Sequence, residues 1–365
     1  MAIKCGIVGL PNVGKSTIFN ALTRSVALAA NYPFATIDPN VGIVPVPDPR
    51  LDELTRIVPT QKVVPTTLEV VDIAGIVKGA SQGEGLGNQF LSHIAEVDAI
   101  IHVVRCFEGG DIVHVSGSVD PLRDIEVIGT ELILKDMDVL AKHRARYEKA
   151  ARSNDKKAQQ TMPVIEKYEA AFNAGRSGRT VQLTPEEKVI AREFRLITDK
   201  PVLYAANVSE EEAAGADGPL AAKVKALAQS EGSAYIKISG KVEEDISRLE
   251  PSERGEFLQA MGLQEPGLDR LVREGYRLLG LITFFTVGET ENRAWTVSKG
   301  STAPQAAGKI HSDFEKGFIR AEVVGYDDFV RYKGEQAAKE AGRFRLEGKE
   351  YIVADGDIMH FRFSV

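Results

Sequence analysis

The sequence has 365 residues and a net charge of −7, with 43 % hydrophobic and 27 % charged residues. These values are typical of a globular protein of two or three domains, and they exclude a general electrostatic attraction to nucleic acid or membranes. Its two cysteines, Cys5 and Cys106, lie in apolar runs, and no run approaches the ~20 apolar residues of a membrane helix. We therefore expect a cytoplasmic protein without disulfides or membrane contact.

Short apolar runs alternate with helical stretches in the first part of the chain and again after residue 200. Runs of this length, with helices between them, predict an α/β domain with a mainly parallel sheet that is covered on both faces. A helix is expected over residues 15–24. The expected strands cover residues 3–8, 68–72, 98–105, 201–207 and 234–239.

This alternation breaks near Pro121. Apolar residues then recur at helical spacing in two successive stretches, which predicts an antiparallel helical hairpin inserted into the sheet domain. Residues 142–157 hold seven Lys and Arg residues against Glu148 and Asp155. This pattern indicates either a solvated helix face or a contact with RNA or an acidic protein.

A third part follows Arg277. A helical stretch over residues 303–318 lies among short strand-like runs, which predicts a small α+β unit of about 85 residues. The expected strands cover residues 282–287, 294–297, 320–324, 351–353 and 358–363. We read this unit as a packing or interaction module without chemistry of its own.

Residues 9–16 read Gly-Leu-Pro-Asn-Val-Gly-Lys-Ser and match the pattern G-x-x-x-x-G-K-[ST] between a strand and a helix. The glycines permit a turn that directs backbone N–H groups at phosphates, and Lys15 adds a charge there that also serves catalysis. The Ser16 hydroxyl is a ligand for Mg²⁺. The predicted nucleotide-binding residues of this loop are Gly9, Asn12, Val13, Gly14, Lys15, Ser16 and Thr17.

Two further elements are typical of a hydrolytic switch. Asp72 ends a predicted strand and Gly75 follows it in the spacing D-x-x-G, so we expect Asp72 to hold the hydrated Mg²⁺ and Gly75 to donate its N–H to the γ-phosphate. Thr36, in the loop over residues 33–40, is expected to complete the metal shell through its hydroxyl. The alternative for Thr36 is a solvent-facing loop residue. Both loops would be ordered by the γ-phosphate and released after hydrolysis.

The segment after the strand over 201–207 bears on the choice of base. GTP-specific proteins of this class carry Asn-Lys-x-Asp there, whereas this chain has Asn207, Val208, Ser209 and Glu210. A longer carboxylate pairs poorly with guanine, while Asn207 can serve N7 and the 6-amino group of adenine. We predict ATP as substrate, with Asn207 and Val208 at the base and GTP disfavoured. The alternative is an ordinary turn with base recognition elsewhere.

Together these motifs closely resemble the YchF subfamily of Obg-like ATPases, over essentially the whole chain. The segments that carry the resemblance are residues 9–16, 31–36, 72–81, 83–90, 207–210, 293–296, 303–311 and 313–319. The resemblance implies Mg²⁺-dependent ATP hydrolysis and contact with ribosomes. It also implies three domains, which are a Ras-like nucleotide-binding domain over 1–122 and 199–279, a coiled-coil insertion over 123–198 and a β-grasp TGS domain over 280–365.

The water-orienting position differs from that of many related GTPases. They carry Gln directly after the D-x-x-G glycine, and this chain has Ile76, which cannot form a hydrogen bond to water. His114 is our candidate substitute, because it follows the strand over 98–105 at the end where ligands bind in such sheets. A structural histidine is the alternative. Asn12 is a candidate ligand for K⁺.

We therefore expect a monomeric, slow ATPase whose nucleotide state sets its affinity for the ribosome. A first alternative is an ATP-sensing module without useful hydrolysis, which Ile76 would permit. A second is a GTPase with relaxed base specificity. A small-molecule kinase is disfavoured, because the sequence lacks a recognisable acceptor pocket or basic lid.

Overall fold

The computed structural model describes residues 3–28, 40–73, 86–109, 118–153 and 155–364. The chain forms two compact units, one of Met1–Ile43 with Glu69–Leu271 and one of Val44–Leu68 with Val272–Val365. Within the described ranges, no helix is long and apolar enough to cross a membrane.

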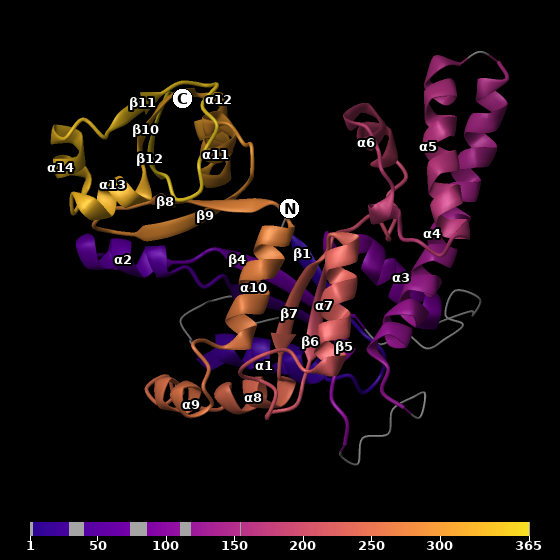
Figure 1. The fold of residues 1–365 in the computed structure, drawn as a ribbon. Helices are drawn as coiled ribbons and strands as arrows, with labels where there is room; N and C mark the ends of the chain where they lie inside the picture. The colour runs from indigo at the N-terminus through magenta and orange to yellow at the C-terminus, as the bar shows by residue number, and fades with distance from the viewer. Residues whose placement is uncertain (1–2, 29–39, 74–85, 110–117, 154, 365) are drawn as a thin grey trace. The chain divides into compact units, whose positions relative to one another are not determined.

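The first unit is built on a six-stranded sheet of order β2-β4-β1-β5-β6-β7 (Figure 1). The β1/β4, β1/β5, β5/β6 and β6/β7 pairs are parallel. Every residue of β5 and β6 is buried, as expected where helices cover both faces of a parallel sheet. The strands are β1 (Lys4–Val8), β2 (Val41–Pro45), β4 (Thr67–Asp72), β5 (Ala99–Arg105), β6 (Val202–Asn207) and β7 (Ala234–Ile238).

The helices of this unit connect the strands, so that ligand-binding loops gather at the carboxyl ends of the strands. The five predicted strands and the predicted first helix are confirmed, and β2 is an additional strand. The helices are α1 (Lys15–Leu28), α3 (Leu86–Glu96), α7 (Pro219–Glu231), α8 (Gly240–Ile246), α9 (Arg254–Ala260) and α10 (Gly267–Leu278), whose last turns pass into the second unit.

Both cysteines are buried and carry free thiols. Burial raises the pKa of the Cys5 thiol and of the Cys106 thiol to about 12. Because the thiolate is the reactive form, these side chains act as small apolar core residues.

The predicted helical hairpin is confirmed as α4 (Pro121–Ala151) and α5 (Lys156–Asn173), which extend from one side of the sheet in Figure 1. Asp120 begins α4 by accepting the N–H groups of Leu122 and Arg123, and Asp155 begins α5 in the same way. The two helices bury a shared apolar seam that includes Leu140, Val164, Tyr168 and Phe172. The chain returns to the sheet through η1 (Gly178–Thr180) and α6 (Pro185–Ala191).

A buried carboxylate ties this hairpin to the sheet. Asp136, in the middle of α4, is fully buried and accepts three hydrogen bonds, at 2.8 Å from Ile197 N and at 2.7 Å from both Thr198 N and Thr198 Oγ1. Nearby, the Tyr168 hydroxyl donates to Asp199 Oδ2 at 2.6 Å. These bonds fix α4 and α5 to the segment that leads into β6.

Replacing Asp136 by alanine should therefore lower the stability of the first unit. Three buried donors would lose their acceptor, and each costs about 1–3 kcal/mol when left unpaired, so we expect a loss of roughly 3 kcal/mol or more. The measurement is the midpoint of urea unfolding. Asp138→Ala is the matched control, because Asp138 is exposed on the same helix. Equal midpoints for the two variants would contradict the proposed anchor.

The second unit is built on a six-stranded sheet of order β11-β10-β12-β8-β9-β3. An antiparallel hairpin of β8 and β9 is followed by the helix α11. The last strand, β12, lies between β8 and β10, and it is parallel to β8 and antiparallel to β10. This is a β-grasp arrangement. The strands are β3 (Val63–Val64), β8 (Leu281–Thr286), β9 (Asn292–Ser298), β10 (Phe318–Val324), β11 (Arg345–Glu347) and β12 (Ile358–Phe363). The helices are α2 (Pro49–Ile57), α11 (Ala303–Ile310), α12 (Ser312–Lys316), α13 (Tyr326–Arg331) and α14 (Glu335–Glu340).

Three expectations are corrected in this unit. The helix predicted over 303–318 is broken at His311, whose backbone is extended and whose ring Nδ1 accepts the Asp313 N–H at 3.2 Å, so that a new helix begins there. The strand predicted over 351–353 is wrong, since only an isolated bridge joins Ile352 to Thr302.

The third correction concerns residues 44–68, which the sequence placed in the nucleotide-binding domain. In the structure this segment belongs to the second unit. Its β3 pairs with β9, and Leu51 and Leu54 of α2 share a core with Phe285 and Ile358. The contacts that place it join residues more than 200 positions apart, which no local pattern reveals.

Candidate nucleotide-binding site

The predicted phosphate loop lies between β1, which ends at Val8, and α1, which begins at Lys15. Its backbone has positive φ at Asn12 (62°) and Gly14 (92°), and such turns direct successive N–H groups toward an anion at a helix N-terminus. A Cβ on Gly14 would lie 2.2 Å from Asn207 Nδ2, and one on Gly9 would lie 2.7 Å from Val103 O. Both positions therefore require glycine for space, and Gly14 also requires it for conformation.

The structure brings Lys15 and Asp72 together at the mouth of this loop. Lys15 is 9 % exposed, and its Nζ lies 2.5 Å from Asp72 Oδ1, at the end of β4. Ser16, the next residue, is exposed. A buried ammonium group suits phosphate, and the hydroxyl and carboxylate oxygens of Ser16 and Asp72 are ligands that Mg²⁺ prefers. These residues fit a nucleotide with its Mg²⁺.

Asn207 joins the phosphate loop to a second loop. Its side chain is 4 % exposed; Nδ2 donates to Val13 O and Oδ1 accepts the Gly240 N–H, both at 2.8 Å. The sequence predicted a contact with adenine and missed this bridging role. It also missed Gly240, although the polar turn Ser239-Gly240 directly after a buried strand lies where ligands bind in parallel sheets.

The neighbours of Asn207 occupy different environments. Val208 is 2 % exposed and donates its N–H to Ile238 O at 2.8 Å, so its predicted contact with the nucleotide stays a prediction. Glu210 is exposed on the following turn. The buried Ser239 hydroxyl has no hydrogen-bond partner among the described residues. A buried polar group of this kind is usually satisfied by a ligand or a water molecule, which is consistent with ligand binding here.

Three predicted site residues, Thr36, Gly75 and His114, lie outside the described residues, as does Ile76. Their roles stay predictions. Thr17 is half-buried in the first turn of α1.

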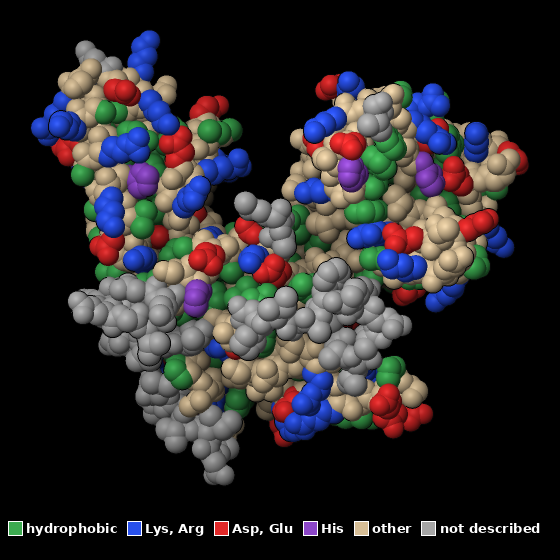
Figure 2. Space-filling model, turned by 180° about the vertical axis from the view of Figure 1, so that it is seen from behind, with side chains coloured by type: hydrophobic (Ala, Val, Ile, Leu, Met, Phe, Trp, Pro, Cys, Tyr) green, Lys and Arg blue, Asp and Glu red, His purple; other side chains and the backbone are tan. Residues whose placement is uncertain are grey.

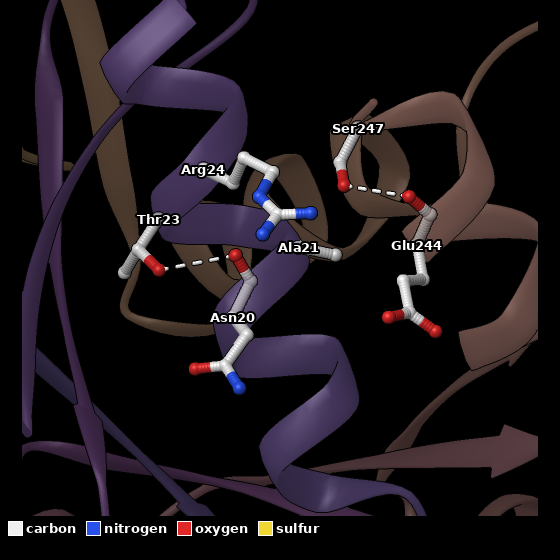
Figure 3. A pocket seen from close by; sticks show the side chains of 6 residues that line it. All are labelled: Asn20, Ala21, Thr23, Arg24, Glu244 and Ser247. Atoms are coloured by element: carbon white, nitrogen blue, oxygen red, sulfur yellow. Dashed lines mark hydrogen bonds between the residues drawn. The ribbon is translucent and has the colours of Figure 1, made fainter. Parts of the chain in front are cut away.

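A hollow of about 450 Å³ lies between α1 and α8, away from this site. Figure 3 shows Arg24 reaching toward it from α1 and Glu244 facing it from α8. Its lining residues are Asn20, Ala21, Thr23, Arg24, Glu244 and Ser247. None of them belongs to the phosphate loop or to the Asn207 bridge, so the hollow is not the nucleotide site.

The helix that begins at Gly240 also carries a buried carboxylate. Glu243 is 2 % exposed and accepts the N–H groups of Gly267 (2.7 Å) and Leu268 (3.2 Å) at the start of α10. Gly267 is needed for this contact, because a Cβ there would lie 2.8 Å from Glu243 Oε1. Burial raises the pKa of Glu243 from 4.5 to about 7, and it outweighs the two N–H donors that favour the charged form.

This shift predicts a pH dependence of stability. Between pH 4.5 and about 7 the folded state holds a proton on Glu243 that the unfolded state releases, so stability falls as pH rises through this window. Glu243→Gln cannot ionise and should lack this contribution, which is on the order of 3 kcal/mol. The measurement is urea unfolding of both proteins at the two ends of the window. Glu244→Gln, a change at the next residue, should keep the pH dependence of the parent. If the free energy of unfolding of the parent and of Glu243→Gln changed equally with pH, Glu243 would not be the group responsible.

A parallel sheet with this phosphate loop, the Lys15–Asp72 pair and the Asn207 bridge defines a Ras-like P-loop nucleoside triphosphatase. Residues 4–143 match the family model described as "50S ribosome-binding GTPase", and residues 281–364 match the YchF-GTPase_C model, described as "Protein of unknown function (DUF933)". Proteins called "Ribosome-binding ATPase YchF" from Escherichia coli O157:H7 and Bacillus subtilis (strain 168) are each 55 % identical to this chain, with complete coverage of both chains. The chain therefore belongs to the YchF family.

A solved structure supports the same assignment. The structure of the Schizosaccharomyces pombe YchF GTPase superposes with a TM-score of 0.89 at 41 % identity, over 99 % of this chain and 97 % of that chain. The fold of this chain, including the helical hairpin and the C-terminal β-grasp unit, is thus similar to that of the S. pombe protein.

Proposed function

We propose that this protein is a slow ATP-hydrolysing P-loop switch that engages the ribosome in a nucleotide-dependent way. The observation that carries the proposal is the Lys15–Asp72 pair at the phosphate loop, where a cation for phosphate and a carboxylate for Mg²⁺ meet. Relatives that are 55 % identical over the full length are called ribosome-binding ATPases, which supports ATP as substrate and the ribosome as partner. Glu210, exposed where GTP-specific proteins place the guanine-reading aspartate, supports the preference for ATP.

Hydrolysis in this site is a matter of positioning and charge. The backbone N–H groups of residues 9–16 and the Lys15 ammonium hold the β- and γ-phosphates and stabilise the charge that develops on them. Mg²⁺, held by Ser16, Asp72 and Thr36, would neutralise phosphate charge. Because Ile76 cannot orient water, turnover is slow, and His114 is proposed to orient the attacking water. K⁺ beside Asn12 is proposed as a further cation.

The helical hairpin is proposed to contact RNA. Of its seven basic residues between 142 and 157, Arg144 is neutralised by Glu169, Arg152 by Glu148 and Lys157 by Glu193. Figure 2 shows Lys and Arg side chains spread over this hairpin. The basic residues with no ion pair among the described residues are Lys142, Arg146, Lys149 and Lys156. Arg146 also lies over the Tyr147 ring, at 5.5 Å from its centroid. Cations gathered on the two helices of the hairpin suit a phosphate backbone.

We also propose a monomer that works in the cytoplasm. The proposed domains are the nucleotide-binding part, the insertion over 123–198 and the TGS domain from residue 280. Residues 44–68 are assigned to the last of these, following their packing.

The test is calorimetry with ATP and GTP in the presence of Mg²⁺, followed by ATPase rates with and without purified ribosomes. We expect ATP to bind at least about tenfold more tightly than GTP, a difference of ~1.4 kcal/mol, and ribosomes to change the turnover. Equal affinities would refute the base preference. Absence of ribosome binding in every nucleotide state would refute the partner.

The second candidate is an ATP-sensing module without useful hydrolysis, which Ile76 favours. It predicts nucleotide-dependent ribosome binding with no phosphate release above background, with or without ribosomes. Single-turnover measurements with ATP distinguish the two candidates.

A further inference from the structure

The two edges of β12 are paired unequally. Toward β10, the register runs from Ile358 opposite Val324 to Phe363 opposite Phe318. Toward β8, only Ile358 is paired, opposite Phe285, because β8 ends at Thr286. Residues 360–363 of β12 therefore have no strand neighbour on the β8 side among the described residues.

The backbone groups on this free side can be assigned from the register. Phe285 N donates to Asp357 O at 2.8 Å, so Asp357 directs its carbonyl toward β8. Alternation along a strand then directs the N–H and C=O groups of Phe361 and Phe363 to the same side. On the other side, Ser364 N donates to Gly317 O at 2.9 Å, as the alternation requires. Two residues thus offer main-chain donors and acceptors at this edge that have no partner within the described ranges.

An aromatic groove of about 360 Å³ lies beside this edge. Its apolar walls come from β9, α11, α12 and β12, and its rim is polar. The lining residues are Thr286, Glu291, Trp295, Ile310, Phe314, Met359, His360, Phe361 and Arg362. Figure 2 shows hydrophobic side chains gathered between two histidines on the visible face of this unit.

Two of the polar groups at the rim have hydrogen-bond partners within the protein. Trp295 Nε1 donates to Thr286 Oγ1 at 2.9 Å, and Arg362 pairs with Glu322 at 2.9 Å. His360 Nε2 lies 3.0 Å from a Glu335 carboxylate oxygen but forms no hydrogen bond among the described residues. The groove therefore presents mainly aromatic surface. Beside it, the groups without a hydrogen bond are His360 Nε2 and main-chain groups of β12.

The β11 edge of the same sheet is built differently. It is formed by β11, which has three residues and carries the charged side chains Arg345 and Glu347. Short, charged edge strands discourage pairing with other chains. The free part of β12 also carries Arg362, but the two residues whose main chains face this side are Phe361 and Phe363.

We propose that the free edge of β12 binds an extended segment of a partner protein, which adds to the sheet as a further strand and places an apolar side chain in the groove. Alternating N–H and C=O groups at a strand edge are complementary to another main chain, and alternate side-chain pockets supply specificity. A nucleobase stacked on Trp295 or Phe361 would leave these main-chain groups unpaired. The proposal does not rest on the nucleotide site.

The probe is a library of random twelve-residue peptides selected against the full-length protein, from which the tightest binder is synthesised. We expect the amides of Phe361 and Phe363 to exchange hydrogen at least tenfold more slowly when this peptide is bound. A version of the peptide with N-methyl groups on alternate amides should bind at least tenfold more weakly in fluorescence anisotropy, since it keeps its side chains and loses the main-chain pairing.

Two variants locate the site. Phe314→Ala removes one wall of the groove and should weaken peptide binding at least tenfold. Leu346→Ala, at the exposed position on β11, is the matched control and should leave binding unchanged. The proposal is overturned if no peptide is enriched, if the N-methylated peptide binds equally well, or if the two amides stay unprotected. An oligouridine that displaces the peptide and binds more tightly than it would instead assign the groove to nucleobases.

Discussion

Replacing Lys15 by alanine is expected to weaken ATP binding roughly 100-fold and to lower the turnover of bound ATP by about 10²–10³, the usual effect of removing one charged donor from a phosphate or oxyanion site. The Lys15 ammonium is nearly buried and lies 2.5 Å from Asp72, so its position is set before a nucleotide arrives. The variant also leaves the Asp72 carboxylate without its cation beside the incoming phosphates. Calorimetry with Mg²⁺ and ATP, and single-turnover hydrolysis, measure the two effects.

Lys4 supplies a matched control for this experiment. It pairs with Glu69 at 2.6 Å between β1 and β4, but its side chain is 41 % exposed and lies at the opposite end of β4 from Asp72. Lys4→Ala should bind and hydrolyse ATP as the parent does. Comparable losses in the two variants would mean that Lys15 acts only through general stability, and parent-like behaviour of Lys15→Ala would remove the basis of the proposed function.

Replacing Asn207 by alanine is expected to weaken ATP and GTP by the same factor. The side chain bridges Val13 O and Gly240 N, so its loss leaves a buried acceptor and a buried donor unpaired, at a cost of about 2–4 kcal/mol in stability. The variant loses the fixed position of the phosphate loop relative to the loop at Gly240. We expect ATP and GTP to depend equally on this position. Thermal unfolding and the two dissociation constants test this.

The ratio of the ATP affinity to the GTP affinity of Asn207→Ala shows whether Asn207 joins the two loops or contacts the base. If Asn207 reads adenine directly, as the sequence suggested, Asn207→Ala should weaken ATP selectively and the ATP-to-GTP ratio should fall. Asn20→Ala, at an exposed position of α1, should change neither stability nor affinity. A selective loss of ATP binding would show that the bridge is secondary.

Much of the site could be predicted because phosphate binding depends on contiguous residues. The loop Gly9–Ser16 carries its own turn-forming glycines, its lysine and its helix start, so a single pattern contains the chemistry. The position of Asp72 at the end of a strand was also predicted, because an apolar strand followed by an aspartate marks the carboxyl end of a strand in a parallel sheet, while its role as a metal ligand stays a prediction.

The second role of Asn207 could not be predicted in this way. The amide is 194 positions from Val13 and 33 from Gly240, and only the parallel order of β1, β5, β6 and β7 brings the three together. From sequence, an asparagine after a buried strand indicates a polar contact at that sheet edge without naming its partner. The sequence suggested adenine as this partner, because Asn207 begins the segment that replaces the guanine-reading motif.

The sequence by itself determined the local elements: the strands, the helical hairpin and the phosphate loop each depend on periodicity or turn chemistry within about a dozen residues. Tertiary structure alone decided which distant groups meet. It placed residues 44–68 with the C-terminal sheet and paired Asp136 with the segment before β6. It also ended β8 short of β12, leaving a free edge. The physical reason is that burial and hydrogen bonding are satisfied over the whole fold, so a partner far along the chain can outweigh what neighbouring residues prefer.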